Sequence, residues 1–93
     1  MKIFILTSVA LFAEYGDLDS MDDPSVNTSV FLTLEGAKGK MQAELETEKE
    51  DAEIAGYDCT TESHERTASF ESGEKGSGCS WNLVTWEIVE KEI

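Results

Sequence analysis

The sequence predicts an α+β domain of order ββαββ, in which an antiparallel four-stranded sheet carries one long helix packed on one face. Three observations lead to this prediction: an apolar run near the N-terminus, a central segment with apolar residues at helical spacing, and an apolar run near the C-terminus. The chain has 93 residues, 40% hydrophobic and 29% charged, which is the composition of a folded chain. We therefore expect a single acidic α+β domain over residues 1–93.

The first predicted strand covers residues 2–13. Its residues are apolar on both alternating faces, as in a central strand that is covered on both sides. A signal peptide is the alternative interpretation, but the run is short for one and lacks a clean small-x-small cleavage site. It is also too short to cross a membrane. We expect a strand here.

Residues 14–27 are predicted to form the longest connection, because Gly16, Pro24 and several aspartates favour turns. The aspartates invite a calcium interpretation, but Met21 and Thr28 stand where an EF-hand loop needs ligands. A short strand should follow at 29–32.

The central segment predicts a helix from Leu34 to about Ala55, with Thr33 as N-cap and Gly56 as a left-handed C-cap. Spacing of 100° per residue places its apolar residues in one stripe: Leu34, Ala37, Met41, Leu45, Ala52 and Ala55. Glu46, Glu50 and Glu53 lie on the opposite face, and further acids flank them at Glu44, Glu48 and Asp51.

The remainder predicts a connection from residue 57, then a hairpin of strands 63–71 and 79–90 around a glycine-rich loop at 72–78. The last strand is heavily apolar, so we expect it beside the first strand in the middle of the sheet. One helix covers only one face of such a sheet. The 14–27 loop, a second copy of the chain or a target protein would have to cover the other.

Charge is the most informative feature of the composition, with twenty acidic residues against seven basic ones and a formal net charge of -13. Such a field repels nucleic acid and accelerates encounter with basic protein surfaces. The predicted partner-binding residues are therefore the acids of the loop and of the outward helix face: Asp17, Asp19, Asp22, Asp23, Glu46, Glu50 and Glu53. The alternative is an ordinary solvated surface that keeps the protein soluble.

Residues suited to catalysis or metal binding form no recognisable motif. His64 lacks a nucleophile in a known arrangement, and paired carboxylates are too common here to be specific. Cys59, His64 and Cys79 could supply three zinc ligands, but no Cys-x-x-Cys pair anchors the site, and the two cysteines could pair only in an exported chain. We predict neither an enzyme, nor a metal site, nor a cofactor.

In general character the chain resembles the small inhibitors that phages and mobile elements direct against restriction or CRISPR nucleases, a resemblance that transfers no residues. It implies a non-enzymatic acidic domain in the bacterial host cytoplasm that blocks the basic nucleic-acid-binding groove of a nucleic-acid-processing enzyme. The alternative is a small assembly protein that homodimerises through the uncovered sheet face.

Overall fold

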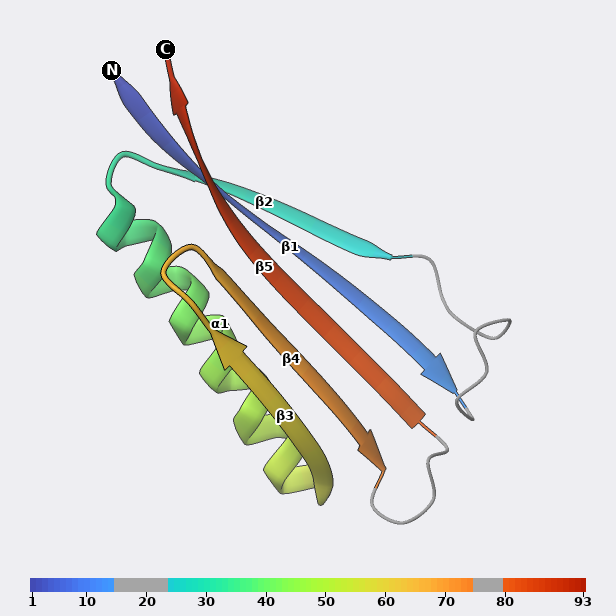
Figure 1. Cartoon of the computed structure of the whole chain (residues 1–93). Coiled ribbons are helices and arrows are strands. Elements are labelled where there is room, and N and C mark those ends of the chain that lie inside the picture. The colour runs from blue at the N-terminus through green and yellow to red at the C-terminus, as the bar shows by residue number, and fades with distance from the viewer. Residues whose placement is uncertain (15–23, 75–79) are drawn as a thin grey trace.

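The computed structural model describes residues 1–14, 24–74 and 80–93, which form one sheet and one helix (Figure 1). The strands and the helix follow one another in this order: β1 (Lys2–Glu14), β2 (Ser25–Phe31), α1 (Leu34–Ala55), β3 (Tyr57–Ser63), β4 (Thr67–Glu74) and β5 (Ser80–Glu92).

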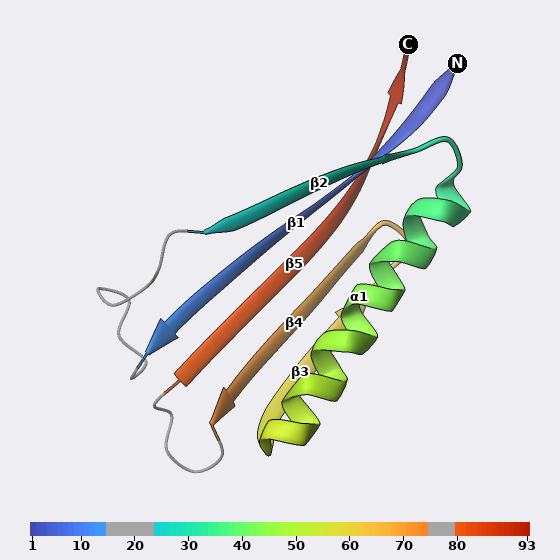
Figure 2. The same ribbon diagram turned by 180° about the vertical axis from the view of Figure 1, so that it is seen from behind.

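The sheet has the order β2-β1-β5-β4-β3, and each neighbouring pair is antiparallel. β1 and β5 pair along their whole length, from Lys2 opposite Glu92 to Glu14 opposite Ser80. The two most apolar strands therefore form the centre of the sheet, as the sequence predicted, and the chain termini lie side by side (Figures 1 and 2).

The helix begins and ends where its capping residues predict. The hydroxyl oxygen of Thr33 accepts a hydrogen bond from the Gly36 N–H at 3.0 Å, which satisfies one of the free donors of the first turn. Gly56 adopts φ 76°, a conformation that favours glycine, and its N–H bonds back to the carbonyls of Ala52 and Glu53. The predicted helix, with both caps, is confirmed.

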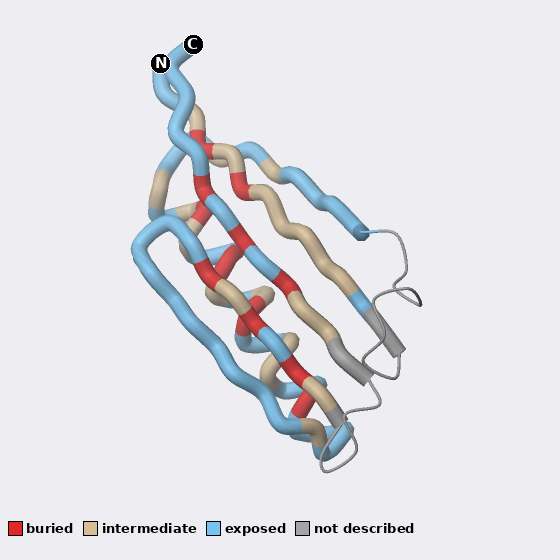
Figure 3. Tube along the Cα trace, turned by 45° about the vertical axis from the view of Figure 1, so that its right-hand side comes forward, coloured by how far each residue is buried: buried red, intermediate tan, exposed pale blue. Residues whose placement is uncertain are grey.

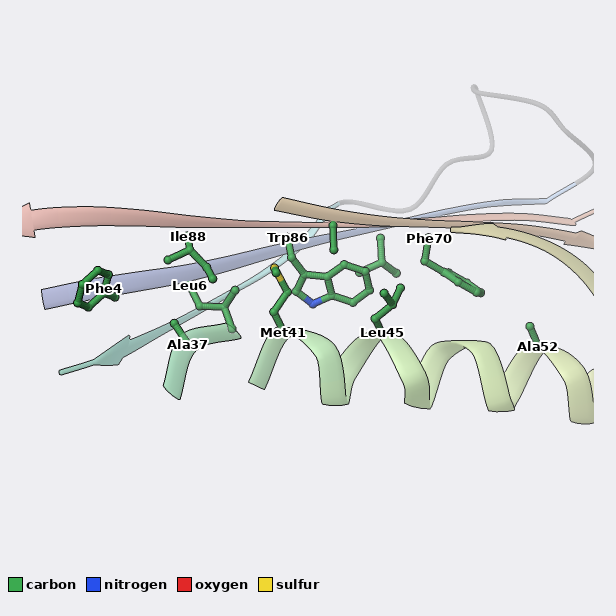
Figure 4. Close-up of a cluster of buried hydrophobic side chains, with 11 residues drawn as sticks. Phe4, Leu6, Ala37, Met41, Leu45, Ala52, Phe70, Trp86 and Ile88 are labelled. Atoms are coloured by element: carbon green, nitrogen blue, oxygen red, sulfur yellow. The ribbon is translucent and has the colours of Figure 1, made fainter. Parts of the chain in front are cut away.

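The hydrophobic core lies between α1 and one face of the sheet (Figures 3 and 4). Met41 and Phe70 are its largest fully buried side chains. Trp86 projects from β5 toward the helix, beside Met41 and Leu45 (Figure 4). Alternate residues of each strand face the helix, so the next residue along each strand faces away from it.

The prediction of a four-stranded ββαββ sheet was wrong, because the sheet has five strands. The additional strand is β3, where a connection was predicted from the sequence. Its sequence, YDCTTES, shows no apolar alternation because β3 is an edge strand, exposed from Asp58 to Ser63. β3 is nevertheless a strand, because all of its residues pair with β4.

Other predicted boundaries need correction as well. The strand predicted at 63–71 begins at Thr67, because Ser63 belongs to β3. Two further errors lie at the ends of β2 and β4. β2 begins at Ser25 and not at residue 29, so part of the predicted 14–27 connection belongs to the sheet. Similarly, Ser72, Gly73 and Glu74 continue β4, whereas the sequence placed them in a loop. Both errors concern polar residues near strand ends, where cross-strand pairing outweighs local turn preference.

Candidate protein-binding surfaces

The outward face of α1 carries the predicted row of carboxylates. Glu46, Glu50 and Glu53 are all exposed, as the helical spacing required. Lys49 lies 3.6 Å from Glu46 and partly neutralises the start of the row. The aspartates predicted to act with this row, Asp17, Asp19, Asp22 and Asp23, lie outside the described residues.

A second acidic row on α1 borders the core. Glu44, Glu48 and Asp51 have the same i, i+4, i+7 spacing as the outward row, shifted by two residues toward the buried stripe. Glu44 is held in place because one of its carboxylate oxygens accepts a hydrogen bond from the Trp86 indole Nε1–H at 3.0 Å. Glu44 is therefore fixed against the sheet and Glu48 is half-buried, whereas Asp51, at the C-terminal end of the row, is exposed.

Next to Glu48 and Asp51 of this second row, a pocket of about 230 Å³ lies between the C-terminal half of α1 and the sheet. Glu48 and Asp51 lie at its helix side, and the remaining lining residues are Ala52, Ala55, Tyr57, Phe70, Ser72 and Asn82. Aromatic and aliphatic surface thus forms much of the wall, with two carboxylates at one side. We name this feature the α1 pocket.

Glu48 is the half-buried carboxyl group of the α1 pocket. Partial burial raises its pKa above the ordinary glutamate value, and the charges of Asp51 and Glu44 raise it further. Among the described residues, neither Glu48 nor Asp51 forms an ion pair with a basic group. The α1 pocket therefore concentrates negative charge that no described cation of the chain offsets.

The helix dipole adds to this imbalance. The C-terminal end of a helix carries partial negative charge and is normally stabilised by Lys, Arg or His in the last turn. The last turn of α1 has no basic residue, and it contains Glu53 and directly follows Asp51. A cation brought to this end by another molecule would relieve both sources of repulsion.

The second candidate surface is the sheet face that points away from α1. Among the described residues, no helix or strand packs on it (Figures 1 and 4). Its aliphatic residues lie on three adjacent strands, β2, β1 and β5: Ile3, Ile5, Val9, Leu11, Val26, Val30, Leu83 and Val89. We call this set the open patch. The prediction that the helix covers one face alone is thus confirmed for the described part of the chain.

The register shows that the open patch is continuous. Ile5 stands opposite Val30 on one side and Val89 on the other, so three aliphatic side chains lie in one row across the sheet. Val26, Val30 and Val89 are 59%, 60% and 46% exposed, which is unusual for aliphatic residues grouped on one surface.

Among the described residues, those considered for chemistry do not form a site. Cys59 lies within β3 and His64 directly follows that strand, about 16 Å away at the rise of a strand, so one zinc ion cannot bind both. Cys79 lies outside the described residues. The described ranges contain no group of three or more His, Cys, Asp or Glu side chains able to hold a metal ion. No helix within them is long and apolar enough to span a membrane.

Sequence reasoning found the outward acidic row and missed the α1 pocket. The spacing of Glu44, Glu48 and Asp51 was visible, but their position beside the apolar stripe becomes a pocket only when Tyr57 and Phe70 are brought beneath the helix. Comparison with known proteins adds no relative: no family model, curated protein or solved structure matches this chain.

Proposed function

We propose that this protein is a non-enzymatic binding domain for a basic protein surface, and that its α1 pocket receives a Lys or Arg side chain of the partner. One observation carries the proposal: the carboxylates of Glu48 and Asp51 border a partly apolar pocket, and no cation of the described chain pairs with them.

The chemistry of the α1 pocket fits a long basic side chain. Lys and Arg combine an apolar stem with a charged head, so the stem would pack on Tyr57 and Phe70 while the head reaches the two carboxylates. At about 230 Å³ the pocket is smaller than the cavities that enclose whole cofactors or drug-sized ligands. A single inserted side chain suits its size better.

The outward row supports the same class of partner. Glu50 and Glu53 extend the negative surface along α1 away from the pocket, and the net charge of -13 steers basic surfaces toward it. Nucleic-acid-processing enzymes have basic grooves of this kind. An inhibitor that occupies such a groove in the host cytoplasm is the role that we propose.

The test measures binding of an arginine-rich peptide, labelled with a fluorophore, to the wild-type protein and to two double variants. Glu48→Gln with Asp51→Asn removes the two pocket charges. Asp58→Asn with Glu62→Gln removes two charges from the exposed edge strand β3 and is the matched control. We expect the pocket variant to lose about tenfold or more in affinity, as for charged pairs in contact, and the control to lose much less.

Equal losses in the two double variants would show that the peptide senses only net charge, and the proposed site would then be wrong. Binding should also weaken as salt is raised, because screening reduces the attraction between opposite charges. Circular dichroism of each variant separates loss of binding from loss of fold.

A further inference from the structure

We infer that the open patch is a homodimer interface, in which two copies of the chain pack face to face through β2, β1 and β5. This inference is independent of the proposed binding of a basic partner, which uses the other side of the molecule. It rests on the size of the patch, on the distribution of charge across the sheet and on the composition of the chain that connects β1 to β2.

The open patch is large enough for a specific interface. From strand geometry it measures roughly 30 Å along β1 and 15 Å across three strands, or about 450 Å² of projected area on each copy. Protruding side chains make the accessible area larger. Two copies together therefore remove about 1,000 Å² from water, the size at which specific interfaces begin.

The connecting segment is a poor cover for this patch. Residues 15–23, YGDLDSMDD, contain four aspartates and only three large apolar residues, Tyr15, Leu18 and Met21. Laid over eight aliphatic side chains, this segment would bring unpaired carboxylates into an apolar contact, which is unfavourable. A second open patch offers aliphatic surface of the same area instead.

Charge is distributed unevenly across the same sheet face, and this favours one dimer geometry. The β2–β1 half carries aliphatic and hydroxyl side chains, whereas the β4–β3 half carries Asp58, Glu62 and Glu71. A two-fold axis parallel to β1 places β1 on β1 and sends the two acidic halves to opposite sides of the dimer. The apolar halves then meet, and the acidic halves stay in water.

Two charged residues of β5 also lie on this face, Glu87 in register with Thr7 and Lys91 in register with Ile3. In the dimer with its axis along β1, β5 of one copy lies over β2 of the other, so Glu87 lies over the hydroxyl of Thr28 in the second copy. A hydroxyl can donate a hydrogen bond to that carboxylate. Glu87, the acidic residue that the interface would cover, thus keeps a hydrogen-bond partner.

Salt distinguishes this dimer from binding to a basic partner. Each copy carries a formal charge of -13, so two copies repel each other and screening by salt should strengthen their association. Binding of a basic partner should instead weaken as salt is raised, because there the charges attract each other. Failure of one proposal is therefore visible without failure of the other.

The experiment is sedimentation velocity over a range of protein concentrations at low and high salt, on the wild type and three lysine variants. Val89→Lys places a charge within the open patch, on the central strand β5. Ile54→Lys is the matched control, since Ile54 is an 86% exposed aliphatic residue on the helix. Asn27 lies on the edge strand β2 and faces the helix side, outside the open patch. Asn27→Lys should therefore disrupt a dimer formed by pairing of two β2 edges, but not one formed through the open patch.

We expect a concentration-dependent dimer that salt strengthens. Val89→Lys should weaken it by about tenfold or more, because the interface would bury an unpaired charge, while Ile54→Lys and Asn27→Lys leave it nearly unchanged. A wild-type protein that stays monomeric at high concentration and high salt overturns the inference. A dimer that Val89→Lys leaves intact also overturns the inference if one of the other variants disrupts it. Disruption by Asn27→Lys would assign the contact to the β2 edge, and disruption by Ile54→Lys would assign it to the helix.

Discussion

Among the described acidic residues, Glu48 is the one whose environment departs most clearly from that of an ordinary surface acid. Its raised pKa means that the folded protein binds a proton more readily than the unfolded chain. Stability contributed by this group is therefore gained as pH falls from 7 toward the ordinary glutamate pKa of 4.5, and lost as pH rises. This is the reverse of a carboxylate stabilised by an ion pair.

Replacing Glu48 with Gln should therefore raise the free energy of unfolding at pH 7 and reduce its rise between pH 7 and 5. The neutral amide removes repulsion from Asp51 and Glu44 and has no proton to gain. Urea denaturation at several pH values measures both effects. Glu50→Gln is the control, an exposed acid of the same helix, and an equal effect there would show that general charge repulsion is responsible.

Residue patterns within α1 were sufficient to predict it, and those of the edge strands were not. Thr33, the apolar stripe and Gly56 are local signals, so the bounds of α1 could be read from the sequence. β3 has no such signal, because both of its faces are mostly exposed and its stability comes from pairing with β4. The α1 pocket depends on that pairing, which explains why it was missed.

The two glycines of α1 should respond differently to replacement by alanine. A Cβ at Gly39 would meet nothing within 4 Å, so Gly39→Ala should raise the free energy of unfolding by about 0.5–1 kcal/mol through helix propensity alone. A Cβ at Gly36 would lie 3.1 Å from the Thr33 hydroxyl and 3.3 Å from Phe31. Gly36→Ala should therefore raise the free energy of unfolding by less than Gly39→Ala does, or lower it. Thermal unfolding of the two variants compares their stabilities.

The whole molecule is a flat, two-layered body with Cα extents of 49 × 26 × 16 Å, in which one helix covers one side of a five-stranded sheet. Its two sides carry different chemistry. The helix side concentrates carboxylates around the α1 pocket, and the other side carries the open patch. The overall acidity was evident from composition, whereas this division into an acidic side and an apolar side required the strand order and register.

We thus propose a separate interaction for each side, a basic partner at the α1 pocket and a second copy of the chain at the open patch. A dimer through the open patches leaves both α1 pockets on the outside, each available to a basic partner. Such a dimer would engage a partner with two basic sites more tightly than a monomer does, through effective concentration rather than new contacts.

The central claim is that a basic side chain of a partner enters the α1 pocket, and the pKa of Glu48 tests it most directly. Carbon-detected NMR titration of the glutamate side-chain carboxyls, without and with the arginine-rich peptide, reports that pKa for each residue. We predict that the peptide lowers the pKa of Glu48, because a guanidinium beside it favours the charged form. A Glu48 pKa that stays raised while other carboxyls respond to the bound peptide would contradict the claim.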